Sequence, residues 1–489
     1  MLTVEQIREF IEANQGSEWR TQAQTGQRYY DGEHDILKKR IFFINADGEL
    51  EEDLTKANTR ICHTFFTELV DHEVQHTLSK KNFIRSDDPG LQGELDARFN
   101  YNDDFKAELE TILTGCIVKG KENAYAFKNK DNRTEFAWAD SLNVVKVRAR
   151  DTDDHCEYVI RWYVDRTDKE GKEIKRIEVW TENETFFYVQ VDDGEITIDT
   201  SEENNPRPHI LYTKGKSGKV YQKGFGFIPF FEMEYNRNQA SGLKRIKNII
   251  DDYDEMNCGL SNNIHDTNEA LYIVHGFAGD NLDELMENIK AKKHIGVDEN
   301  GDVDIKTIDI PVEARRTKME LDEKSIYHFG YGVNMDDLKD ASATTNVAIK
   351  SAYERLNMKS NKTETQLRKF LRDVLDVVLP EINAERGTDY QQKDIYFDGE
   401  REMLTNQLEN AQVALAEAQT RQTEINIVMG LQGFIDDETA LELICEQLDI
   451  DVNEIKDKLP KPEEDLYSME QTNPVEPAPA EPTPVPAEL

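Results

Sequence analysis

The sequence predicts an α+β protein of several modules, because helical and strand-type patterns occupy separate stretches of a long chain. Its 489 residues exceed what one hydrophobic core usually holds, so two to four modules are expected. Apolar residues recur at helical spacing over much of the chain, whereas residues 123–235 form short β-type runs. No run approaches the roughly 18 apolar residues of a transmembrane helix. The N-terminus also lacks the pattern of a signal peptide.

The chain is strongly acidic, with 98 Asp and Glu against 59 Lys and Arg and a formal net charge of −39. This balance argues against a protein that reads DNA sequence, because such proteins bind by neutralising phosphates. The acidity either keeps the protein soluble or belongs to a wall along which DNA must slide without sticking, and both explanations stay open. The five cysteines are widely spaced without a CxxC pair, which indicates reduced thiols in a cytosolic compartment.

Helices are expected first at the N-terminal end. A capping box from Thr3 to Gln6 opens a short helix, and a second helix spans Glu18–Tyr30. Residues 58–81 predict a longer helix with Ile61, Phe65 and Leu69 in one stripe, and another helix follows at 103–119. From Asn123 to Tyr235, β-type runs are separated by Asp, Gly and Asn turns, as in antiparallel hairpins.

Two helices with a small insert between them come next. The first covers residues 242–266, and the second covers Val312–Tyr331. The insert predicts a strand at LYIVHG, a short helix at residues 281–292, and strands HIGV and DVDIKTIDI joined by a turn at residues 298–301. The first helix has one apolar stripe, formed by Leu243, Ile246, Ile250, Tyr253, Met256, Leu260 and Ile264.

The last third of the chain is mainly helical. A polar loop precedes a helix over residues 346–386, which has a polar centre at residues 359–364 and which Pro380 should kink or end. A strand at residues 394–398 should return to the N-terminal part. Residues 400–459 are helical again, with caps at Asp436 and Asp451. Proline gathers from Pro460 onward among few apolar residues, which predicts a disordered extension.

One motif suggests catalysis. His72-Glu-Val-Gln-His76 has the HExxH pattern of zinc metallopeptidases, with both histidines on one helix face. Ser79 and Asn82 stand where the metzincin continuation needs Gly and His, and the histidines continue the Ile61/Phe65/Leu69 face, so burial is the alternative. The acidic pairs Asp251-Asp252, Asp336-Asp337 and Asp436-Asp437 suit helix caps better than a Mg²⁺ site. We therefore predict no catalytic, metal-binding or cofactor-binding residue.

Three phrases carry a resemblance to a known family. They are Arg28-Tyr-Tyr-Asp-Gly-Glu-His-Asp-Ile-Leu37, then Gly226-Phe-Ile-Pro-Phe-Phe-Glu-Met-Glu-Tyr-Asn236 before a helix, and Asp340-Ala-Ser-Ala-Thr-Thr-Asn-Val-Ala-Ile349. Over about residues 20–460, the order of these phrases resembles the SPP1-type portal proteins of tailed bacteriophages. The chain departs from the family at residues 341–345, Ala-Ser-Ala-Thr-Thr, where asparagine-alanine-serine-glycine is common.

The resemblance implies a portal fold: an α/β wing, a two-helix stem, a small α/β clip, a long kinked helix and a helical crown. Its parts would be the wing (1–240), first stem helix (241–268), clip (269–311), second stem helix (312–331), tunnel loop (332–345), long wing helix with return strand (346–398), crown (399–459) and disordered proline-rich tail (460–489).

The implied protein is not an enzyme. It is a ring of twelve copies at the unique capsid vertex of the virion, assembled in the host bacterial cytoplasm. Double-stranded DNA would pass through it non-specifically during packaging and ejection. The implied partners are the terminase large subunit, the major capsid and scaffolding proteins, and the head-completion or adaptor proteins, without a membrane. A zinc metallopeptidase and a non-catalytic oligomeric scaffold are the rival interpretations.

Two sets of residues are candidates for the channel. The tunnel loop would surround DNA, although an ordinary helix–helix connection also fits; its residues are Met335, Asp336, Asp337, Leu338, Lys339, Asp340, Ala341, Ser342, Ala343, Thr344 and Thr345. The second set is basic and opens the two stem helices: Lys244, Arg245, Lys247, Arg315, Arg316 and Lys318. In a ring these would form belts that meet phosphates transiently, or they pair with Asp251, Asp252 and Glu320.

Overall fold

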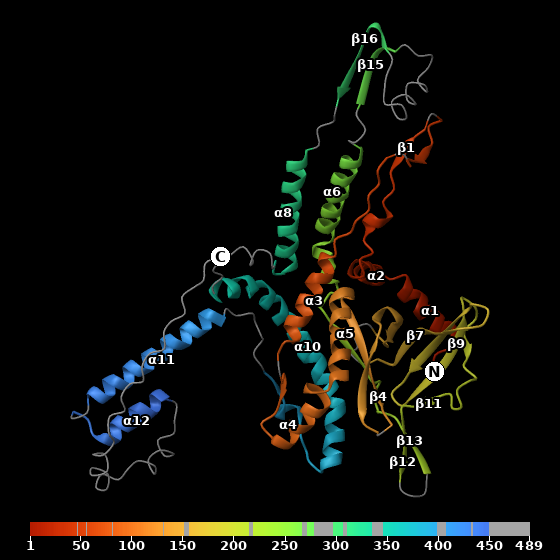
Figure 1. Ribbon diagram of the computed structural model, residues 1–489. Coiled ribbons are helices and arrows are strands. Elements are labelled where there is room, and N and C mark those ends of the chain that lie inside the picture. The colour runs from red at the N-terminus through yellow and green to blue at the C-terminus, as the bar shows by residue number, and fades with distance from the viewer. Residues whose placement is uncertain are drawn as a thin grey trace, which may run out of the picture. The chain divides into compact units, whose positions relative to one another are not determined.

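The computed structural model describes residues 1–448 except for several gaps. The gaps are Ala46, Thr55, Lys81, Asp131 and residues 151–155, 215–218, 267–270, 278–296, 307–310, 335–345, 399–406 and 432–433. Contacts divide the chain into two units, Met1–Leu404 and Thr405–Leu489. Helices and small antiparallel sheets make up the first unit (Figure 1), which confirms the predicted α+β class.

The N-terminal helices largely follow the prediction. The capping box is present, since the Thr3 side chain accepts from the Gln6 amide and the Gln6 side chain accepts from the Thr3 amide. The observed helices are α1 (Val4–Gln15), α2 (Glu18–Tyr30), α3 (Phe65–Leu78), α4 (Pro89–Leu95) and α5 (Asp103–Lys119).

The predicted start of the third of these helices is wrong. Residues 58–64 are not helical, because their backbone groups bond to a helix far along the chain: the Thr59 amide to Asn262 Oδ1, the Ile61 amide to Cys258 Sγ and the His63 amide to Asp254 Oδ1. Ile61 is 44% exposed and so does not belong to the buried stripe. The buried face of α3 is instead centred on Phe66, Leu69, Val70, Glu73 and Val74.

Antiparallel strands make up most of the described part of residues 121–234, as predicted. One sheet has the order β14-β4-β5, with β4 at Lys121–Lys128, β5 at Thr134–Ala139 and β14 at Phe230–Glu234. A larger sheet has the order β10-β9-β8-β7-β6, with β11 also on β9. Its strands are β6 (Val144–Val147), β7 (Tyr158–Thr167), β8 (Glu173–Trp180), β9 (Glu184–Val191), β10 (Thr197–Ile198) and β11 (Arg207–Pro208), and β12 (Ile210–Lys214) pairs separately with β13 (Lys219–Lys223).

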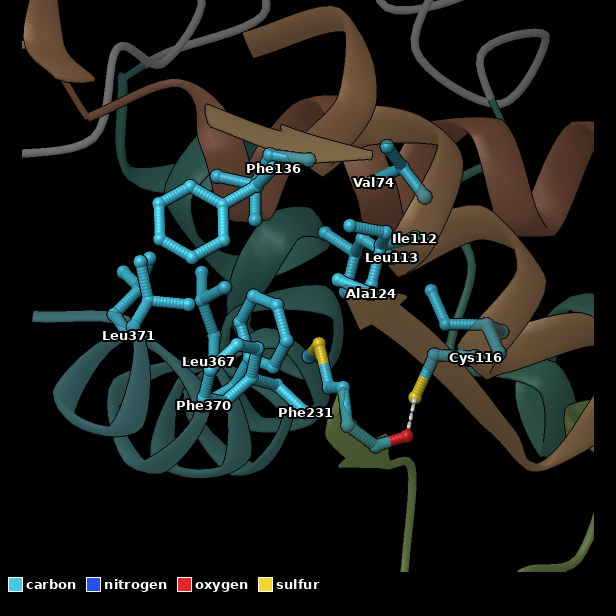
Figure 2. Packing of buried hydrophobic residues seen from close by; sticks show 14 of the residues in the cluster. Val74, Ile112, Leu113, Cys116, Ala124, Phe136, Phe231, Leu367, Phe370 and Leu371 are labelled. Carbon is cyan, nitrogen blue, oxygen red and sulfur yellow. Dashed lines mark hydrogen bonds between the residues drawn. The ribbon is translucent and has the colours of Figure 1, made fainter. Parts of the chain in front are cut away.

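The main core lies where α10 (Asn346–Arg386) meets α3, α5 and the sheet β14-β4-β5. Figure 2 shows Phe370 and Leu371 of α10 close to Phe231 and Phe136 of the strands. The bounds of α10 are those predicted, and Figure 1 shows its axis bent. Pro380 does not end the helix, contrary to one predicted outcome, because buried residues on both sides of it, Val378 and Ile382, hold the helix to the core.

Two antiparallel helices form the predicted pair with an insert. A 3₁₀ turn at Gly242–Arg245 leads into α6 (Lys247–Asp266), which packs along α8 (Val312–Gly330). Within the insert, β15 (Leu271–Phe277) pairs with β16 (Val297–Lys306). The predicted turn at residues 298–301 is wrong, since these residues lie within β16, where a register shift between His275 and Phe277 accommodates them. The predicted helix at 281–292 lies outside the described residues.

The remaining elements close the first unit and make up the described part of the second. The return strand is confirmed as β17 (Tyr396–Phe397), which pairs with β3 (Ile84–Arg85). A two-stranded hairpin, β1 (Phe42–Ile44) with β2 (Leu50–Glu52), lies between α2 and α3. The second unit contains α11 (Gln407–Gly430) and α12 (Asp437–Leu448), the latter capped by Asp436 as predicted. The cap at Asp451 and the proline-rich tail fall outside the described residues.

Among the described residues, no helix is both long and apolar enough to span a membrane.

Candidate functional site

The six basic candidates lie at two places on the paired helices. Lys244 and Arg245 are exposed in the 3₁₀ turn before α6, and neither forms an ion pair with any residue that the structure describes. Lys247 begins α6, while Arg315, Arg316 and Lys318 lie near the start of α8. Lys247 and Lys318 reach neighbouring acids of α6, Asp251 and Asp252, so the basic groups of the two helices approach each other there.

Three of the six pair with the acids that the alternative interpretation named. Lys247 Nζ lies 2.7 Å from Asp251, Arg316 Nε lies 3.0 Å from Glu320, and Lys318 bridges α8 to Asp252 of α6. Arg315 instead donates to the Met256 carbonyl oxygen at 3.4 Å. Part of the positive charge therefore fixes the two helices to each other.

Lys247 also ties α6 to the N-terminal segment. Its Nζ lies 2.7 Å from Asp35 and 4.8 Å from the centre of the Tyr29 ring. Burial lowers the pKa of Lys247, but its hydrogen bonds to Asp251 and Asp35 outweigh burial and raise this pKa above the ordinary lysine value. The ammonium is thus committed to these carboxylates within its own chain.

The predicted tunnel loop, residues 335–345, lies outside the described residues, but its approach from α8 is well defined. Tyr331 has a left-handed backbone with φ 61°, which ends α8, and the Gly332 amide donates to the Tyr327 carbonyl oxygen. A Cβ at Gly332 would come within 2.1 Å of Leu69 Cδ2, so a larger residue here would force the buried Leu69 side chain to move. Lys359 of α10 donates to the Gly330 carbonyl oxygen at 3.0 Å. The segment that leads into the loop is therefore held against α3 and α10.

The HExxH motif belongs to a polar seam between α3 and α10. The fully buried Glu73 lies 2.8 Å from Lys359 Nζ and accepts from Thr363 Oγ1 at 2.7 Å. His76 Nε2 lies 2.6 Å from Asn357 Oδ1. In a zinc peptidase, the glutamate equivalent to Glu73 faces a metal-bound water, and a ring nitrogen of the histidine equivalent to His76 binds the metal. These contacts contradict the metallopeptidase alternative, and the described residues hold no other group of His, Cys, Asp or Glu suited to a metal ion.

A buried cluster that sequence reasoning missed joins the segment before α3 to α6. The fully buried Asp254 lies 2.7 Å from His34 Nδ1 and 2.8 Å from His63 Nδ1, and it also accepts from the His63 amide at 3.0 Å. Burial raises the pKa of Asp254, but hydrogen bonds with His34 and His63 outweigh burial and hold this pKa below its usual value. Tyr29 stacks on the His34 ring at 4.4 Å.

A weak sequence signal for this cluster did exist. Asp254 and Cys258 follow Ile250 at intervals of four, and all three are buried on one face of α6. A carboxylate on an apolar face needs partners. Nothing local identified these partners, because His34 and His63 lie 220 and 191 residues away in the chain.

Comparison with known proteins gives one family. The family model "Phage portal protein, SPP1 Gp6-like" matches residues 11–454. The chain is 27% identical over 348 residues to the portal protein of Bacillus phage SPP1, covering 71% of this chain and 67% of that protein. It is 26% identical over 480 residues to the portal protein of Clostridium phage phiCD119, covering 93% and 98%.

A solved structure with some likeness is a chain from the neck of a native GTA particle computed with C12 symmetry. It is 11% identical, with a TM-score of 0.34, and the match covers 78% of this chain and 90% of that chain.

Proposed function

This chain belongs to the SPP1 Gp6-like family of phage portal proteins, and from that premise we propose that it assembles into a closed ring of about twelve subunits. The ring sits at one vertex of a phage capsid, after assembly in the host bacterial cytoplasm. Terminase drives DNA through its channel during packaging, and the DNA leaves by the same channel at infection. The protein is a structural component of the particle rather than an enzyme.

The match of the family model over residues 11–454 is the observation that carries this proposal. The local structure is compatible with the parts that the family implies. Residues 241–268 and 312–331 are the stem, the insert at 269–311 is the clip, and 332–345 is the tunnel loop. Residues 1–240 and 346–398 form the wing, 399–459 the crown, and 460–489 a tail. The clip meets terminase and later the head-completion proteins, while the wing meets the capsid and scaffolding proteins.

The charges of the stem support a channel that DNA passes without tight binding. The net charge of −39 per subunit repels phosphates over most of a ring. Among the basic candidates, only Lys244 and Arg245 are both exposed and without an ion pair to described residues. Repeated around a ring, they would form one belt for transient phosphate contacts. Lys318 would instead join the two stem helices through Asp252, while Lys247 and Arg316 pair with acids of their own helices.

Mass photometry and negative-stain imaging of the purified full-length chain test the ring. We expect particles with the mass of about twelve chains and a central hole. A chain that stays monomeric up to tens of micromolar, alone or with its scaffolding protein, would contradict the proposal.

The belt is tested separately on assembled rings. Replacing Lys244 and Arg245 with glutamine should leave ring assembly intact and weaken the retention of short duplex DNA at low salt. The matched control replaces Arg316 and Lys318, which are paired within the chain, and should change DNA retention less. If the Lys244/Arg245 and Arg316/Lys318 variants lose the same amount of DNA retention, Lys244 and Arg245 have no special role in contacting DNA.

A further inference from the structure

The segment between α2 and α3, residues 31–64, carries an exposed apolar surface. We call this segment the arm. Its hairpin pairs Ile44 with Leu50 and Phe42 with Glu52, so these four side chains share one face of the two strands. Ile44 is 70% exposed, Leu50 69% and Phe42 49%. No other described helix or strand packs extensively against either strand.

The segments on either side of the hairpin are bonded to α6, although the apolar face of the hairpin is exposed. Lys39 Nζ lies 2.6 Å from Glu255, and the Thr59 amide donates to Asn262 Oδ1 at 2.7 Å. The buried Asp254 holds the arm on both sides of the hairpin, through His34 before it and His63 after it. The hairpin is therefore presented from α6 at a defined position rather than left as a loose loop.

An isolated two-stranded hairpin is only marginally stable in water, and persistent strands need an apolar face that is covered. Clustered apolar side chains on a protein surface usually mark a contact with another molecule. Within the described part of the first unit, nothing covers this face. The surface that covers this face therefore lies outside the described part of the first unit.

The negative charge of the hairpin limits which kind of surface can cover its apolar face. Asp47, Glu49 and Glu51 are exposed and form no ion pair with described residues. A chain with net charge −39 repels another acidic surface. The covering surface must therefore combine apolar side chains with cations that its own chain has not neutralised.

Helix α8 of the same protein offers such a surface. Leu321 (57%) and Phe329 (51%) are large apolar residues exposed on this helix, and Leu321 points well away from the buried Asp322 and Ile326. Lys324 follows Leu321 by three residues, so it is a neighbour of Leu321 on the helix surface, and it is exposed and without an ion pair to described residues.

We propose that the arm hairpin of one subunit packs against the outer face of α8 in a second copy of this chain. This proposal rests on the ring proposed above. A head-to-tail ring needs two different, mutually complementary patches on each subunit, and the hairpin and α8 are complementary in both apolar surface and charge. Phe42, Ile44 and Leu50 contact Leu321, while the hairpin acids approach Lys324.

Disulfide trapping tests the contact directly. A chain with both Ile44→Cys and Leu321→Cys should form, under mild oxidation, a ladder of covalent multimers on a non-reducing gel. Each single variant should form no ladder above the background of the native cysteines. The matched control combines Leu321→Cys with Ile198→Cys, which is 59% exposed on β10, and should give no ladder either. Wild-type rings without a ladder from the Ile44/Leu321 pair would overturn the proposal while the ring itself stands.

A second measurement follows assembly. Ile44→Asp should raise the concentration at which rings form by tenfold or more and leave the thermal midpoint of the monomer within a few degrees of wild type. Ile198→Asp should assemble as wild type does. Unchanged assembly of I44D would overturn the arm contact. A wild-type chain that never forms rings is a distinct result, visible without any variant, and it overturns both proposals.

Discussion

The core around α10 differs from the stem and its arm in how far apolar and charged side chains are buried within the chain. In the core, even charged groups are buried with partners from the same chain, as Glu73 is with Lys359 and Thr363. Along the stem and arm, large apolar groups such as Leu321 and Ile44 remain exposed. Cations such as Lys324 there have no ion pair with described residues. The core is complete within one chain, whereas the proposed contact with a second copy would complete the stem and arm.

This difference separates folding from assembly within one sequence. Burial of apolar side chains supplies most of the free energy of folding, and the core has that burial before any second copy arrives. The exposed groups of the stem and arm contribute little until another chain covers them. Mutations in the two regions should therefore affect different measurements.

The largest expected effect on folding comes from truncating a core leucine. Leu375 of α10 is 1% exposed, so Leu375→Ala should lower the free energy of unfolding by about 3–4 kcal/mol through lost burial and a residual cavity. Chemical denaturation of the monomer measures this. A loss below about 1 kcal/mol would show that the core around α10 repacks easily, and the comparison would weaken.

The buried cluster at Asp254 should behave like the core although it lies on the stem. Asp254→Ala leaves His34 and His63 without their carboxylate, and we expect a loss of about 2–3 kcal/mol together with faster hydrogen exchange in residues 35–64. Asp252→Ala is the matched control on the same helix. Its carboxylate is 42% exposed beside Lys318, so its removal should cost less than about 1 kcal/mol.

Acid should weaken the core through Glu381, which is 11% exposed. Burial raises the pKa of Glu381, but hydrogen bonds from Lys128, Thr134 and Arg98 outweigh burial and lower this pKa from 4.5 to about 2. Because the folded pKa is the lower one, the stabilisation is complete above pH 4.5 and disappears as the pH falls from 4.5 towards 2.

Comparison with Glu381→Gln isolates this contribution. Between pH 6 and pH 3, the wild type should lose about 1–2 kcal/mol more unfolding free energy than E381Q, since the amide cannot titrate. Urea denaturation at both pH values measures the difference. Parallel losses would mean that the carboxylate gains nothing from its three partners.

How much of this the sequence predicts depends on where the partners of each residue lie. Where caps and apolar spacing along one segment determine a helix, its bounds were predicted to the residue. Examples are Glu18–Tyr30, Asp103–Lys119 and Asn346–Arg386. Residues 58–64 were wrongly predicted as helix. Their apolar spacing fits a helix, yet hydrogen bonds to Cys258, Asn262 and Asp254 take the place of helical ones.

The candidate site shows the same limit. The ion pairs of Lys247 and Arg316 join residues four apart on one helix and were anticipated as an alternative. The cluster of His34, Asp254 and His63 joins three distant segments and was missed. The HExxH motif suggested zinc because spacing alone cannot reveal that Glu73 meets Lys359 across a helix interface. The tunnel loop stays a prediction.

The smallest effect on folding should come from the same substitution on the stem. Leu321 is 57% exposed on α8, so Leu321→Ala should change the unfolding free energy of the monomer by less than about 0.5 kcal/mol. Its effect should fall on assembly instead, because the lost side chain would have been buried only against a second copy. Denaturation and ring formation are measured on L321A beside L375A. A loss of unfolding free energy in L321A approaching that of L375A would mean that α8 is already buried within one subunit, and the division between a complete core and an incomplete stem would then be wrong.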